Sequence, residues 1–122
     1  MPEYIFDHIH LRSTDPQKTA EFYEKMFGAK IVRIQPAAEG RGASAKLEIS
    51  GVTILIAQVK EGEPAGLHHF GIRTTGLENS VSGLKEKGVK FTQEVRVVNP
   101  TFKMSFLVAP DSVPIELQEG QI

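Results

Sequence analysis

Apolar and polar side chains alternate at the start of the chain, from Tyr4 to Arg12. This spacing of two residues predicts a half-buried strand with one apolar and one polar face. The apolar face carries Ile5, Ile9 and Leu11, and the polar face carries His8, His10 and Arg12. The first strand therefore presents two histidines on the same face.

The spacing changes after this strand to that of a helix. Asp15 and Pro16 are a typical capping residue and first-turn proline, and Gly28 is a natural end for the helix. A second helix is expected from Leu77 to Lys87, with Gly88 as its end. Further strands are expected at residues 30–35, 45–50, 52–59, 67–74, 89–93 or a little beyond, 102–108 and 113–119.

The sequence contains an internal repeat of one structural unit. His8 aligns with His69 (69 − 8 = 61), and the same offset aligns Leu55 with Glu116 (116 − 55 = 61). The sequence thus predicts an α+β fold of two tandem βαβββ units, residues 4–59 and 67–119, joined by a polar linker at 60–66 within a single domain, 1–122. Two such units would curl their uncovered sheet faces into a half-barrel cavity.

Strand periodicity indicates which side chains would line this cavity. His8, His69 and Glu116 fall on the cavity face at three of four equivalent positions, and Leu55 fills the fourth. Two imidazoles and a carboxylate suit a divalent metal, and three protein ligands leave positions open for water or substrate. A single strand histidine is more often a packing residue than a ligand, so the prediction depends on the coincidence of all three.

Composition narrows the function classes. The chain has 122 residues, a net charge of −1 and no cysteine. The charge indicates neither a nucleic-acid partner nor an anionic membrane surface, and the lack of cysteine excludes disulfides and thiolate chemistry. Its longest apolar run, Val52 to Ala57, is too short to span a bilayer, and no signal peptide is evident. We therefore expect a cytoplasmic protein.

These residues resemble the vicinal oxygen chelate superfamily, which includes glyoxalase I, methylmalonyl-CoA epimerase, extradiol dioxygenases and bleomycin-binding proteins. The resemblance rests on Asp7-His8-Ile9, Phe22-Tyr23, His69-Phe70-Gly71-Ile72, Phe106-Leu107 and Pro114-Ile115-Glu116-Leu117. It implies a divalent ion (Zn, Ni, Co, Mn or Fe) on His8, His69 and Glu116, chelated by two substrate oxygens and stabilising an enediolate-type intermediate. Leu55 stands where glyoxalase I and the epimerase generally have glutamate or glutamine.

Further residues are candidates for the site. His10 and Glu39 are candidate catalytic residues beside Glu116; the alternatives are a wall residue for His10 and a solvated loop residue for Glu39. Three cations would bind an anionic part of a substrate, or else form surface ion pairs: Arg12, Arg73 and Lys103.

The resemblance favours a metal-dependent lyase or isomerase, of the glyoxalase or epimerase type, acting on a small carbonyl or thioester substrate. The alternatives are an Fe(II)-dependent dioxygenase with a 2-His-1-carboxylate site, or a metal-free small-molecule binding protein. A homodimer is also expected. Whether the site is completed within one chain or across the dimer stays open at this point.

Overall fold

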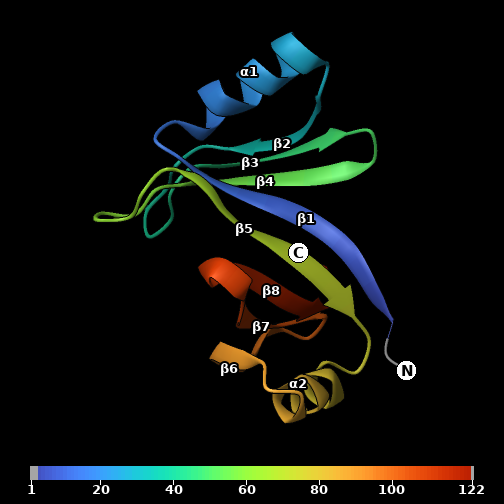
Figure 1. The fold of residues 1–122 in the computed structure, drawn as a ribbon. Helices are drawn as coiled ribbons and strands as arrows, with labels where there is room; N and C mark the ends of the chain where they lie inside the picture. Colours follow the sequence, from blue (N-terminus) through green and yellow to red (C-terminus); the bar gives the residue numbers. More distant parts are fainter. Residues whose placement is uncertain (1–2, 122) are drawn as a thin grey trace. The chain divides into compact units, whose positions relative to one another are not determined.

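The computed structural model describes residues 3–121 and divides the chain into two compact units. The N-terminal unit is His8–His68, and the C-terminal unit comprises residues 69–121 together with residues 3–7. Each unit is built from a four-stranded mixed sheet and one helix (Figure 1). The α+β class and the two tandem βαβββ units predicted from the sequence are confirmed.

Five elements form the N-terminal unit, in the spatial strand order β2-β3-β4-β1. They are β1 (Tyr4–Ser13), α1 (Pro16–Phe27), β2 (Lys30–Gln35), β3 (Ser44–Ile49) and β4 (Val52–Gln58). The first residues of β1, up to Asp7, belong to the C-terminal unit. Strand β1 pairs with β4 in parallel, and the other pairs are antiparallel. Ser50 and Gly51 join β3 to β4 with φ values of 48° and 81°. A two-residue hairpin turn needs such positive φ values, which explains the glycine.

Helix α1 lies over β2, β3 and β4 (Figure 1). The Asp15 side chain accepts a hydrogen bond from the Lys18 backbone N–H, and Gly28 ends the helix in the left-handed conformation. Ala20 is fully buried and Tyr23 packs against the same core. Phe22, the residue before Tyr23, is half exposed. At about 100° per residue, Phe22 and Ala20 point to nearly opposite sides of the helix.

The C-terminal unit repeats this order of elements, with strands arranged β5-β8-β7-β6. Its elements are β5 (Gly66–Thr74), α2 (Leu77–Glu86), β6 (Lys90–Asn99), β7 (Phe102–Ala109), a 3₁₀ turn (Pro110–Ser112) and β8 (Val113–Glu119). Leu77 and Val81 of α2 pack against Leu117 of β8, with Leu84 at the margin of this core. Strand β6 is longer than the sequence pattern indicated, and three register shifts interrupt its pairing with β7.

The repeat extends to the register of the strands. Ile9 pairs with Ile54 in the parallel β1–β4 ladder, and Phe70 pairs with Ile115 in the parallel β5–β8 ladder. One residue further on, His10 pairs with Leu55, and at the same step Gly71 pairs with Glu116. Both ladders keep the offset of 61 read from the sequence, so residues aligned by the repeat occupy equivalent places in their units.

Among residues 3–121, neither helix has both the length and the apolar character that crossing a membrane would require.

Candidate metal and substrate site

A buried histidine and a buried glutamate meet in the C-terminal unit. His69 Nε2 lies 3.1 Å from Glu116 Oε1, and both side chains are almost fully buried. His69 comes from β5 and Glu116 from β8, which are neighbouring parallel strands. The structure therefore brings together two of the three ligands predicted from the sequence.

Strand register explains why these two side chains meet. The Cα partner of Glu116 on β5 is Gly71, which carries no side chain. His69 precedes Gly71 by two residues, so it lies on the same face of the sheet as Glu116. With only a glycine directly beside Glu116, the imidazole of His69 reaches the carboxylate without an intervening side chain.

Phe106 of β7 lies next to both His69 and Glu116. It is the antiparallel partner of Glu116 on β7, and its ring lies edge-on to the His69 ring at a centroid separation of 5.0 Å. An apolar ring here limits the access of water to both polar groups, which strengthens their electrostatic interaction. In the sequence, Phe106 stands out only as part of the family motif Phe106-Leu107. The signal that could have assigned it was strand pairing, because the partner of Glu116 on the preceding strand must share its face.

The donor set of this pair suits a metal ion. An imidazole nitrogen and a carboxylate oxygen are the ligands that divalent transition metals commonly use. A buried carboxylate is costly unless it is paired or bound to a metal. Without an ion, a protonated Nε2 of His69 donates to the carboxylate; with one, both atoms have lone pairs to offer to it. The residues present therefore fit a divalent cation.

The other histidines lie in the N-terminal unit. The rings of His8 and His10 have centroids 6.2 Å apart, and His10 is 6.1 Å from the ring of His68. His68 Nε2 in turn lies 3.7 Å from a carboxylate oxygen of Glu63. His10 is therefore part of a row of imidazoles on β1 and at the start of β5. Its catalytic role stays a prediction.

The two arginines predicted to bind substrate are both engaged in ion pairs. Arg12 Nε lies 3.2 Å from Glu63 Oε1 in the N-terminal unit, and Arg73 Nε donates to Asp7 Oδ1 at 3.1 Å in the C-terminal unit. The pKa of Glu63 is lowered, chiefly by the backbone N–H of Lys60 and further by the charge of Arg12. Each guanidinium keeps other N–H groups for an anion, so the binding role of both residues remains a prediction.

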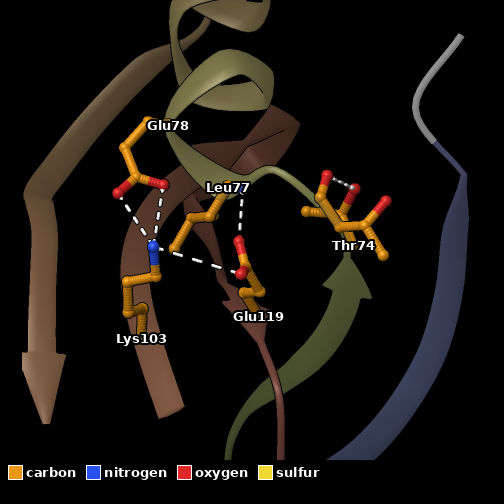
Figure 2. Close-up of polar contacts among 6 residues, drawn as sticks. Thr74, Leu77, Glu78, Lys103 and Glu119 are labelled. Atoms are coloured by element: carbon orange, nitrogen blue, oxygen red, sulfur yellow. Dashed lines mark hydrogen bonds and ion pairs between the residues drawn. The ribbon is translucent and has the colours of Figure 1, made fainter. Parts of the chain in front are cut away.

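Lys103 lies on the other face of its sheet. Its ammonium group donates to both carboxylate oxygens of Glu78 on α2, and Glu119 lies 4.0 Å away (Figure 2). The hydrogen bond with Glu78 raises the pKa of Lys103 and lowers that of Glu78. Lys103 and Phe106 are three residues apart on β7, so their side chains point to opposite faces. The structure thus does not bring Lys103 to the face of Glu116.

Glu39 is exposed at the tip of the loop between β2 and β3. The backbones of Ala38 and Arg41 pair across this tip as an isolated bridge, which holds Glu39 in a tight turn. A catalytic role for Glu39 stays a prediction.

The family of the chain follows from comparison with known sequences. A sequence model of the Glyoxalase/Bleomycin resistance protein/Dioxygenase superfamily matches residues 5–117. The chain therefore belongs to this superfamily, and the resemblance stated from the sequence is confirmed.

Individual relatives are more distant. The uncharacterized protein YwkD of Bacillus subtilis (strain 168) is 29% identical over 123 residues, covering 92% of this chain and 94% of that protein. A trivalent organoarsenical cleaving enzyme of Bacillus sp. (strain MD1) is 31% identical over 87 residues, covering 69% of this chain and 52% of the enzyme. The chain thus matches about half the length of that enzyme.

Among solved structures, the methylmalonyl-CoA epimerase of Mycobacterium tuberculosis superposes with a TM-score of 0.74. The two chains are 21% identical, and the match covers 96% of this chain and 88% of the epimerase. This likeness establishes the glyoxalase-like fold.

Proposed function

We propose that this protein is a divalent-metal-dependent lyase or isomerase that acts next to the carbonyl group of a small carbonyl or thioester substrate. The observation that carries the proposal is the buried contact between His69 Nε2 and Glu116 Oε1. Two metal-ligand side chains held together on rigid strands, away from solvent, are a costly arrangement for a purely structural role. A bound metal ion would offset the cost of burying these two side chains.

His8 is the proposed third ligand. It is the repeat equivalent of His69, which already lies beside a carboxylate. Its covalent neighbour Asp7 belongs to the unit that holds His69 and Glu116, where it accepts hydrogen bonds from Arg73 and Gln121. Phe6 of the same strand stacks on Phe70, the residue after His69. His8 therefore directly follows two residues, Phe6 and Asp7, that contact residues of β5.

A bound divalent ion would act as a Lewis acid that stabilises negative charge on substrate oxygens. The protein's own residues would supply the rest of the chemistry. His69 and Glu116 would hold the ion in place, and Phe106 would keep water away from it. His10 would accept or return a proton near neutral pH. The organoarsenical cleaving enzyme among the relatives supports bond cleavage as a reaction class.

The first test is the metal content of the protein purified without chelators, measured by inductively coupled plasma mass spectrometry. We expect about one equivalent of metal in the wild type and a loss of most of it in His8→Ala, His69→Ala and Glu116→Ala. His68→Ala is the matched control, because it removes the histidine next to His69 in β5 and should retain the metal. Circular dichroism would establish that each variant is folded.

The outcomes separate the possible functions. Stoichiometric zinc, nickel, cobalt or manganese would direct the search to thioesters and hemithioacetals as substrates. No metal, even after reconstitution, would contradict the proposal and leave a binding protein. Normal metal content in His8→Ala would remove His8 from the ligand set.

One observation favours a second candidate function, an Fe(II)-dependent dioxygenase. Leu55 is the repeat equivalent of Glu116, so the fourth position holds an apolar side chain. Two histidines and one carboxylate, with no fourth ligand, are the set used by non-haem Fe(II) oxygenases. Iron in the purified protein, with oxygen uptake on addition of catechols, would favour this function over the lyase or isomerase.

We also propose that the protein is a homodimer, as small two-unit members of the superfamily commonly are. Light scattering coupled to size-exclusion chromatography would measure the mass. A monomer of 13.4 kDa would contradict this assignment.

A further inference from the structure

A pocket in the N-terminal unit is lined by cations. It has a volume of about 340 Å³ and lies at one end of the sheet. Its charged lining residues are Arg12, Arg41 and Lys60, and no acidic residue lines it among those that the structure describes. This concentration of positive charge stands out in a chain whose net charge is −1.

Strand register creates the hollow. Arg12 of β1 and Ser44 of β3 are both Cα partners of Ala57 on β4, so the three side chains share one face of the sheet in a row. The methyl group of Ala57 is the smallest of the three. A small residue between two longer ones leaves a depression with a guanidinium on one side and a hydroxyl on the other.

The backbone around the depression is held in place. Gln58 Oε1 accepts a hydrogen bond from the Ala43 N–H at 2.9 Å, and the Gln58 N–H donates to Ala43 O at 3.0 Å. The Val59 N–H donates to Ser13 O, which keeps Lys60 close to β1. Arg41 is fixed by one hydrogen bond, from Nη2 to Pro36 O at 3.0 Å. The cations are therefore attached to a fixed frame.

One carboxylate partly compensates this charge. Glu63 pairs with Nε of Arg12 and does not line the pocket. This contact orients Arg12 and leaves its terminal N–H groups unused by that ion pair. After this pairing the group still carries an excess of two positive charges, which matches a phosphate dianion better than a single carboxylate.

We propose that this pocket binds a phosphate group, either free or carried by a small-molecule ligand. Arg12 and Arg41 would supply the planar donor groups that match phosphate oxygens, and Lys60 would add a compact charge. The proposal does not rest on the metal site, because every residue that carries it lies in the N-terminal unit and serves as no proposed metal ligand.

The test is a ¹H–¹⁵N NMR titration of the as-purified protein with inorganic phosphate at constant ionic strength. We expect saturable shifts of the Gly42, Ala43 and Ser44 amides. Arg41→Gln and Lys60→Gln should each raise the Kd about tenfold, because each removes a charge-assisted contact. The matched controls Arg33→Gln and Lys30→Gln remove the same charges from exposed residues outside the pocket, and they should leave the Kd unchanged.

Parallel titrations identify the ligand. Saturation by phosphate and by a phosphate monoester, with none by acetate, would support the proposal, and tighter binding of the ester would indicate a carried phosphate. Shifts centred on His69 and Glu116 would mean that phosphate binds at the metal site instead, and would overturn it. So would a linear response without saturation, or an equal loss of affinity in the control variants. Because two independent variants are used, misfolding of one does not decide the result.

Discussion

The two units differ most clearly at one pair of equivalent strand positions. In the C-terminal unit Gly71 faces Glu116, whereas in the N-terminal unit His10 faces Leu55. The ladder and its register are the same in both. The C-terminal unit thus places its polar group on the last strand, with no side chain opposite, and the N-terminal unit places its polar group on the first strand, with an apolar side chain opposite.

The third strand of each unit continues this contrast. Phe106 is the antiparallel partner of Glu116, and Lys46 is the antiparallel partner of Leu55. The buried carboxylate therefore has an aromatic neighbour, and the apolar residue has a cationic one. A duplicated scaffold thus keeps its backbone pairing while only one copy buries a carboxylate at this position. Variants of one unit can therefore be controlled by the equivalent variants of the other.

The largest effect on stability is expected from Phe106→Ala. This change removes the ring that packs edge-on against His69 and should lower the free energy of unfolding by about 2 kcal/mol. The equivalent change in the other unit, Lys46→Ala, removes no aromatic contact and should cost well under half as much. Urea denaturation followed by circular dichroism measures both. Equal losses in the two variants would mean that Phe106 has no special packing role.

Leu55→Glu should make the N-terminal unit resemble the other. By supplying a fourth ligand, which would be the second carboxylate of the set, it is expected to tighten metal binding by about tenfold, which corresponds to about 1.4 kcal/mol. Lys46 would compete for the new carboxylate, so the double variant with Lys46→Gln should bind more tightly still. Competition with a chromophoric chelator measures the affinity. Unchanged affinity in both variants would place Leu55 outside the metal site.

The two helices begin differently. Asp15 caps α1 through its own side chain, whereas α2 begins after Gly76 and its Leu77 N–H donates to Glu119 Oε1 of β8 at 2.8 Å (Figure 2). Glu119→Ala should therefore lower the free energy of unfolding by about 1 kcal/mol. Asp15→Ala, which removes a longer and more exposed hydrogen bond, should cost about half of that. Thermal unfolding would reveal the opposite order if the distant cap were only incidental.

The smallest effect concerns the ion pair between Lys103 and Glu78, which has no described counterpart at α1. Because the pKa of Glu78 is lowered from its ordinary value of 4.5, its contribution is present above that pH and is lost as the pH falls through the folded-state pKa. The pKa of Lys103 is raised from its ordinary value of 10.5, so its contribution to stability is fully present below that pH and is lost as the pH rises through the folded-state pKa. Glu78→Gln should thus lower the Tm slightly at neutral pH, and this difference should disappear as the pH falls through the folded-state pKa of Glu78, because the wild-type carboxyl then becomes protonated as well. A constant difference in Tm across this range would contradict the assignment.

Much of the fold could be predicted from residue spacing alone. The boundaries of β2 and β8 agree with the prediction, and those of the other strands shift by one or two residues, apart from β6. Strand β6 was underestimated because its register shifts interrupt the alternation on which the prediction relied.

The candidate site divides in the same way. The repeat follows from the order of the residues alone, and with it the equivalence of His69 to His8 and of Glu116 to Leu55, because a strand period of two and a fixed offset need no long-range information. The contact of His69 with Glu116, the position of Phe106 beside this pair and the orientation of Lys103 towards α2 depend instead on tertiary structure. These contacts depend on which strands become neighbours and on the register of their pairing. The register is determined for the whole unit at once, because a shift by one residue would turn every buried side chain of a strand to the other face of the sheet.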